Sequence, residues 1–149
     1  MTDPFLSEPA ANKVPDRGTG LRILVVDDDR TLREGCASVL QMDGHMVTSS
    51  GRGEEALDLV RRKRFDIVLV DLYMSPVTGM EILKAAVDVH KDIIVVVMTG
   101  NPSVASSIEA LRAGAWDYLP KPFSARCWSV ARRTPSASPR MRARSSRRW

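Results

Sequence analysis

The segment Phe65-Asp66-Ile67-Val68-Leu69-Val70-Asp71 decides the fold class of this 149-residue chain. It is a short apolar run that ends on a carboxylate. A run of Ile, Val and Leu this short is typical of a strand that is buried on both faces of a sheet. The final aspartate then lies where the strand leaves the core. In open α/β sheets, ligands bind at the carboxyl ends of the strands.

The same pattern recurs elsewhere in the chain. The apolar residues 23–26 run directly into Asp27, Asp28 and Asp29, residues 93–98 lead into Thr99, and residues 116–120 lead into Lys121. If these strands belong to one parallel sheet, their carboxyl ends meet at one edge. We therefore expect carboxylates, a hydroxyl group and an amine to lie close together at that edge.

Strands and helices are predicted to alternate along the chain. The predicted strands are 22–26, 45–49, 67–71, 93–98 and 118–119, and helices begin near residues 31, 54, 79 and 104. Thr31 with Glu34, and Thr78 with Glu81, have the spacing of a capping box. Alternating strands and helices predict an α/β fold with a parallel sheet and helices on both of its faces.

In order and spacing, these motifs resemble the receiver domain of two-component response regulators. The matching pieces lie between residues 21 and 125. They are Asp27-Asp28-Asp29, Asp71 with Met74, Gly79, Met98-Thr99-Gly100 and Lys121-Pro122-Phe123. The sequence up to Phe123 is most similar to receivers of sigma-54-dependent NtrC-type regulators. The resemblance implies a flavodoxin-like, doubly wound (βα)5 three-layer sandwich with strand order 2-1-3-4-5.

The resemblance implies that Asp71 is the phosphorylated residue. A carboxylate accepts a phosphoryl group as an acyl phosphate, and a divalent cation offsets the repulsion between carboxylates and an anionic donor. Oxygen ligands of this kind suit Mg²⁺. By the resemblance, Asp28, Asp71 and the backbone carbonyl of Tyr73 bind the metal directly, and Asp27 acts through water.

The resemblance also assigns roles to residues around the phosphoryl group. By the resemblance, Lys121 contacts its oxygens, or Asp71 when no phosphate is bound, and Thr99 donates its hydroxyl. Gly100 leaves the approach open, and Pro122 corresponds to a cis-proline that directs the lysine inward. Tyr118 is either a switch aromatic that turns inward on phosphorylation or a half-buried aromatic residue on an edge strand.

The loop after Asp71 departs from the family pattern, and one residue of the acidic run has a plainer reading. The family usually has proline directly after Met74, whereas this chain has Ser75 and then Pro76. The spacing from Asp71 to Gly79 is kept, so the loop length is intact. Asp29 is expected to face outward, as a turn residue before the first helix.

The composition changes abruptly near residue 125. Residues 1–123 carry a net charge of −4, whereas residues 124–149 contain eight arginines, no lysine and no acid. We expect a flexible leader over residues 1–20, the receiver over 21–125, and a poorly ordered arginine-rich tail over 126–149. Pro135 and Pro139 leave room only for a short or irregular fifth helix.

Two hypotheses address the tail. In one, it is an out-of-frame translation, and the chain is a truncated receiver fragment without signalling output. In the other, it binds nucleic acid weakly and without sequence preference through the phosphate backbone. We recognise no sequence-specific nucleic-acid-binding domain and no phosphate-binding P-loop motif in the sequence.

The predicted activity is that of a signalling switch rather than an enzyme. The expected partner is a sensor histidine kinase, and the resemblance also implies a homodimer through the fourth helix, fifth strand and fifth helix, weakened by the tail. A phosphohydrolase of the haloacid dehalogenase type is the alternative, but it needs a second acid where this chain has Tyr73. The longest apolar run, 93–98, is far shorter than the ~18 residues of a membrane span, so we expect a cytoplasmic protein.

Overall fold

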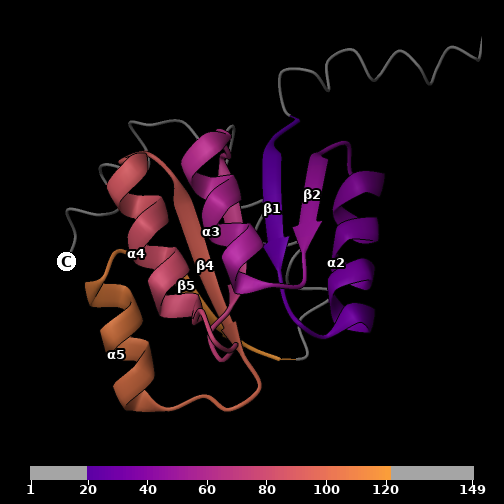
Figure 1. Ribbon diagram of the computed structural model, residues 1–149. Coiled ribbons are helices and arrows are strands. Elements are labelled where there is room, and N and C mark those ends of the chain that lie inside the picture. The colour runs from indigo at the N-terminus through magenta and orange to yellow at the C-terminus, as the bar shows by residue number, and fades with distance from the viewer. Residues whose placement is uncertain (1–19, 122–149) are drawn as a thin grey trace, which may run out of the picture.

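A computed structural model of the chain describes residues 20–121. Strands and helices alternate along this part of the chain, as the sequence predicted (Figure 1). They are β1 (Arg22–Val26), α2 (Arg30–Met42), β2 (Met46–Ser50), α3 (Gly53–Arg62), β3 (Ile67–Asp71), α4 (Gly79–Val89), β4 (Ile94–Thr99), α5 (Val104–Arg112) and β5 (Asp117–Pro120).

The five strands form one parallel sheet in the order β2-β1-β3-β4-β5. This confirms the flavodoxin-like fold and the strand order that the resemblance implied. The strand arrows in Figure 1 point the same way, so the carboxyl ends meet at one edge of the sheet. Across that edge, Val26 is paired with Val70, and Asp71 with Met98.

The central strands are buried over their whole length. Each residue of β3 and of β4 is buried, because these strands have neighbours on both sides and side chains packed on both faces. The edge strands β2 and β5 are only partly buried. The apolar runs in the sequence therefore mark the centre of the sheet.

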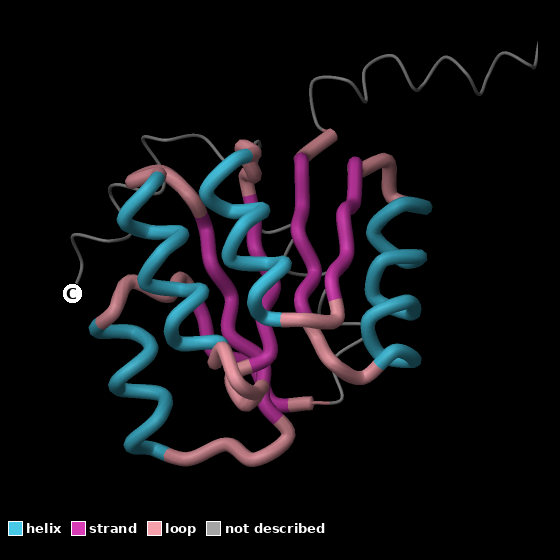
Figure 2. Tube along the Cα trace, in the orientation of Figure 1, coloured by secondary structure: helices cyan, strands magenta, loops and turns pink. Residues whose placement is uncertain are grey.

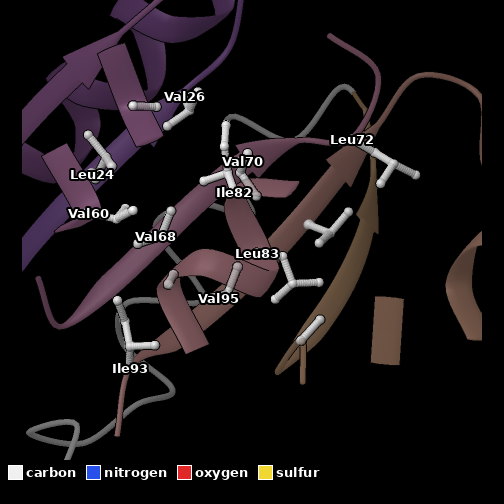
Figure 3. Packing of buried hydrophobic residues seen from close by; sticks show 14 of the residues in the cluster. Leu24, Val26, Val60, Val68, Val70, Leu72, Ile82, Leu83, Ile93 and Val95 are labelled. Atoms are coloured by element: carbon white, nitrogen blue, oxygen red, sulfur yellow. The ribbon is translucent and has the colours of Figure 1, made fainter. Parts of the chain in front are cut away.

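Helices cover both faces of the sheet, which makes the three layers (Figure 2). On one face, α3 and α4 lie side by side, and Ile82 and Leu83 of α4 pack over Val68, Val70 and Val95 (Figure 3). On the other face, α2 contributes Cys36 and Leu40 to a second core cluster. Burial of aliphatic side chains contributes roughly 1.5–3 kcal/mol each, so the two clusters hold the layers together.

The start of α2 differs from the sequence prediction. The residue that caps this helix is Asp29, whose side chain accepts a hydrogen bond from the backbone N–H of Leu32 at 3.2 Å. The predicted pair of Thr31 and Glu34 is wrong, because the helix has already begun at Arg30. Asp29 is exposed and belongs to the turn, as expected.

The predicted cap of α4 is confirmed. Thr78 accepts a hydrogen bond from the backbone N–H of Glu81 at 3.3 Å. The leader, Pro122, the fifth helix and the arginine-rich tail lie outside the described residues, and the predictions about them stay predictions. Among residues 20–121, the helices are too short or too polar to cross a membrane.

Candidate functional site

Three carboxylates meet at the carboxyl edge of the sheet. Asp27 directly follows β1, and Asp71 is the last residue of β3. One oxygen each of Asp27, Asp28 and Asp71 lie within 4.8 Å of one another. Asp27 and Asp71 are buried, whereas Asp28 is exposed. These positions agree with the prediction that the strand ends bring acidic side chains together at one edge of the sheet.

Lys121 joins the cluster from the end of β5. Its Nζ lies 3.0 Å from Oδ2 of Asp27 and 3.4 Å from Oδ2 of Asp71. Its backbone N–H donates to the carbonyl oxygen of Thr99 at 2.8 Å, which fixes the residue beside β4. The resemblance paired the unphosphorylated lysine with Asp71 alone. In the structure the lysine also pairs with Asp27, at the shorter distance.

The environment shifts the pKa values of both Asp71 and Lys121. Burial raises the pKa of Asp71 to about 6, and the charges of Asp27 and Asp28 raise it too, while Lys121 lowers it. Burial also acts to lower the pKa of Lys121, but the hydrogen bonds and charges of Asp27 and Asp71 outweigh burial and raise it. The lysine therefore stays charged, and its ammonium group lies within 3.4 Å of both buried acids.

Thr99 and Gly100 form the rim next to the lysine. Thr99 is fully buried, and its Oγ1 accepts a hydrogen bond from the backbone N–H of Asn101 at 2.9 Å. The hydroxyl proton remains available for another acceptor. Gly100 is exposed, and a Cβ there would meet only Cδ of Lys121, at 3.9 Å. The surrounding protein therefore does not require a glycine at this position.

Gly79, by contrast, is required by packing against the end of β3. A Cβ on Gly79 would lie 2.2 Å from the carbonyl oxygen of Asp71 and 2.7 Å from Cα of Leu72. The backbone N–H of Gly79 also donates to the Leu72 carbonyl at 3.0 Å. The close approach of α4 therefore fixes the backbone of Asp71. In the loop between them, Tyr73 is 52% exposed and the peptide bond before Pro76 is cis.

Tyr118 lies on β5, with its hydroxyl at the start of α5. The hydroxyl oxygen accepts a hydrogen bond from the backbone N–H of Ser103 at 3.1 Å, and it also contacts the Ser106 hydroxyl. The tyrosine is half-buried and packs against the core cluster of α3 and α4. Both readings of Tyr118 remain open, but its link to α5 was not predicted.

The sequence reasoning missed one further residue at this edge. Arg33, in the first turns of α2, donates from Nη1 to the backbone carbonyl of Asp27 at 2.8 Å. Its only sequence signal is its distance of six residues from Asp27, which places it on the helix that follows the acids.

The donor set fits a hard divalent cation. Carboxylate oxygens are the ligands that Mg²⁺ prefers, and the three acids here place oxygens within a radius that one ion can share. Burial raises the pKa of Asp71 most, and the charges of Asp27 and Asp28 add to that rise; a bound cation would favour the ionised carboxylate. The acidic cluster therefore has the composition of a magnesium site.

Comparison with known proteins agrees with this geometry. The family described as the response regulator receiver domain matches residues 23–128. The chain belongs to the response regulator receiver family. The match begins within β1 and includes all three acids and Lys121.

Relatives of this receiver include the response regulator MprA of Mycobacterium sp. (strain KMS), which is 40% identical over 119 residues. That alignment covers 76% of this chain and 52% of MprA, so the receiver spans about half the length of the curated relatives it matches.

Two solved structures are also similar. A response regulator from Burkholderia pseudomallei, solved with a phosphorylated aspartic acid, a calcium ion and citrate, has a TM-score of 0.70 and 27% identity. The match covers 85% of this chain and 74% of that one. The beryllofluoride-activated NtrC4 receiver domain dimer has a TM-score of 0.72 and 25% identity, with coverage of 78% and 98%. The predicted similarity to NtrC-type receivers is therefore seen in part, beside the similarity to MprA.

Proposed function

We propose that this receiver accepts a phosphoryl group on Asp71 from a sensor histidine kinase and acts as a conformational switch. The observation that carries the proposal is the position of Asp71. It is a buried carboxylate at a strand end, 3.4 Å from the ammonium group of Lys121 and grouped with two other acids. The solved Burkholderia relative, with its phosphorylated aspartic acid, supports the assignment.

The transfer is a displacement at phosphorus. An oxygen of the Asp71 carboxylate attacks, the bond between phosphorus and the donor breaks, and the donor keeps the bonding electron pair. Lys121 offsets the charge on the transferred oxygens. Asp28, Asp71 and the Tyr73 carbonyl would hold Mg²⁺, with Asp27 acting through water. The bound ion would supply further charge neutralisation.

The switch would run through the neighbouring strand ends. A phosphoryl group on Asp71 offers the Thr99 hydroxyl a new acceptor, and Lys121 would move towards it from Asp27. Thr99 precedes the loop that leads to α5, whose start holds the hydroxyl of Tyr118. Movement of Thr99 would therefore favour an inward position of Tyr118 over the position in which its hydroxyl contacts the start of α5. This change would alter the surface of α5 and β5.

The partners follow from the family. A histidine kinase would supply the phosphoryl group in the cytoplasm, and a second copy of the chain would pair through α5, β5 and the segment after them. The NtrC4 receiver dimer supports such pairing. No signalling output is proposed, because the receiver spans only about half the length of its curated relatives.

The test is the intact mass after incubation with acetyl phosphate and Mg²⁺. Wild type should gain about 80 Da, the mass of one phosphoryl group, in a form that hydroxylamine removes. Asp71→Asn is the control and should gain nothing. A folded wild-type protein that gains no mass would overturn the proposal.

A further inference from the structure

Arg33 donates a hydrogen bond to the peptide group between Asp27 and Asp28, two of the acids proposed to bind Mg²⁺. Its Nη1 donates to the carbonyl oxygen of Asp27 at 2.8 Å, and this carbonyl belongs to the peptide bond between Asp27 and Asp28. The side chain is only partly exposed. Among residues 20–121 its guanidinium takes part in none of the ion pairs. Its polar contact is therefore to the backbone of the site, rather than to a surface acid.

Asp27 is also held through its backbone N–H and its side chain. The backbone N–H of Asp27 donates to the carbonyl oxygen of Ser50 at 3.2 Å, where β2 ends. The Asp27 side chain accepts from the backbone N–H of Asp29 at 2.9 Å. With its N–H, its carbonyl and one carboxylate oxygen all engaged, Asp27 has little freedom to rotate.

The loop after β2 packs closely against the guanidinium group of Arg33 at Gly51. A Cβ on Gly51 would lie 2.6 Å from Nη1 and 3.1 Å from Cζ of Arg33. The atoms it would meet belong to the end of a flexible side chain, not to the backbone. An alanine at Gly51 would therefore displace the guanidinium from the Asp27 carbonyl while leaving Arg33 in the chain.

We propose that Arg33 is a positioning residue for the divalent-cation site, acting through the Asp27 carbonyl to hold Asp27 and Asp28 in register with Asp71. This inference rests on the proposed function, because it assumes that the three acids bind Mg²⁺. Removing a residue that orients metal ligands without binding the metal itself typically lowers metal affinity by about 10–100-fold. The positive charge of Arg33 acts in the opposite direction, because it repels a bound cation, so a loss of affinity on removing Arg33 reports its positioning role.

The test measures Mg²⁺ affinity by calorimetry in the absence of any phosphoryl donor. Arg33→Ala should weaken the dissociation constant about tenfold or more. Arg30→Ala is the matched control, because it removes the same charge from the same helix. Arg30 is exposed and pairs with Glu34 instead. Arg33→Lys keeps the charge without the planar fork and should recover part of the affinity.

Gly51→Ala provides the second, independent variant. It should weaken Mg²⁺ binding as Arg33→Ala does, and the double variant should be no weaker than Arg33→Ala alone, because both changes remove one contact. Melting temperatures without Mg²⁺ separate this effect from a general loss of stability, which would lower the melting temperature and leave the affinity of the folded protein unchanged.

The Mg²⁺ affinities of these variants decide between a positioning role for Arg33 and none. The positioning role is overturned if folded Arg33→Ala binds Mg²⁺ as tightly as wild type, or if Arg30→Ala loses as much affinity. In either case the proposed function still stands, provided that the wild-type protein binds Mg²⁺ and is phosphorylated. If Arg33→Ala does not fold, Gly51→Ala and Arg33→Lys decide the question. A wild-type protein that binds no Mg²⁺ overturns both the proposed function and this inference.

Discussion

Replacing Gly79 by alanine should disturb both the stability of the fold and the position of Asp71, the carboxylate proposed to be phosphorylated. The new Cβ would lie 2.2 Å from the Asp71 carbonyl oxygen, whereas such carbon atoms are essentially never found within 3.0 Å. The start of α4 and the end of β3 must therefore separate by at least 0.8 Å, the difference between these distances. Both partners are backbone, so no side-chain rotation relieves the contact.

The magnitude follows from that displacement. Overpacking of this kind costs about 1–3 kcal/mol, which in a domain of about 100 residues lowers the melting temperature by about 4–8 °C per kcal/mol. A displacement near 1 Å at a reacting group can slow a reaction by about 10²-fold. We expect Gly79→Ala to lower the melting temperature by several degrees and to slow phosphorylation by acetyl phosphate markedly.

Two other glycines provide matched controls for the same change. Gly35 lies inside α2 with nothing within 4 Å of its missing Cβ, so Gly35→Ala should stabilise the helix by about 0.5–1 kcal/mol. Gly100→Ala should leave stability near that of wild type. The assays are thermal unfolding and the rate of mass gain. Gly79→Ala with wild-type melting temperature and wild-type rate would refute the packing argument.

The other predictions concern charge and hydrogen bonding. The pKa of Asp71 is raised from 3.8 to about 6, so ionising it in the folded protein costs stability on the order of 3 kcal/mol. This cost appears as pH rises from about 4 to 6; Asp71→Asn should therefore melt higher than wild type at pH 7 without Mg²⁺, and equal melting temperatures would contradict this. Lys121→Gln should raise the pKa of Asp71 further and shift the pH profile of phosphorylation to higher pH; an unshifted profile would count against the ion pair. It should also destabilise the fold, since it leaves the buried Asp27 carboxylate without its cation. Tyr118→Phe should cost about 1 kcal/mol, measured by denaturant unfolding, because the Ser103 N–H loses its acceptor; no change would show that water replaces the hydroxyl.

Much of the fold could be predicted from local sequence patterns. The bounds of β3 match the prediction, because the run from Ile67 to Val70 is apolar without interruption and Asp71 ends it. Alternation of strands and helices then fixes a parallel sheet, and a parallel sheet brings Asp27, Asp71 and Thr99 to one edge. The strand order itself needed the resemblance, because alternation is compatible with several orders.

The finer contacts could not be predicted, because they join residues far apart in the chain. The distances from Lys121 to Asp27 and Asp71 depend on how β5 docks against β4. The cap at Asp29 was not predicted, because Thr31 and Glu34 have the spacing of a capping box two residues further along the chain. Arg33 carries no motif at all, and only the packing of α2 against the loop at Gly51 reveals its contact.

The helices of this receiver are unequally anchored. Four residues of α4 are buried, namely Gly79, Ile82, Leu83 and Ala86, whereas Ala110 alone is buried in α5. Val104 and Ile108 of α5 are exposed. Helices with few buried contacts open locally at a lower free energy than the rest of a domain. The amide protons of α5 should therefore exchange with solvent well before those of β3 and β4, and we expect α5 to respond more readily than α4 to a small change at Thr99.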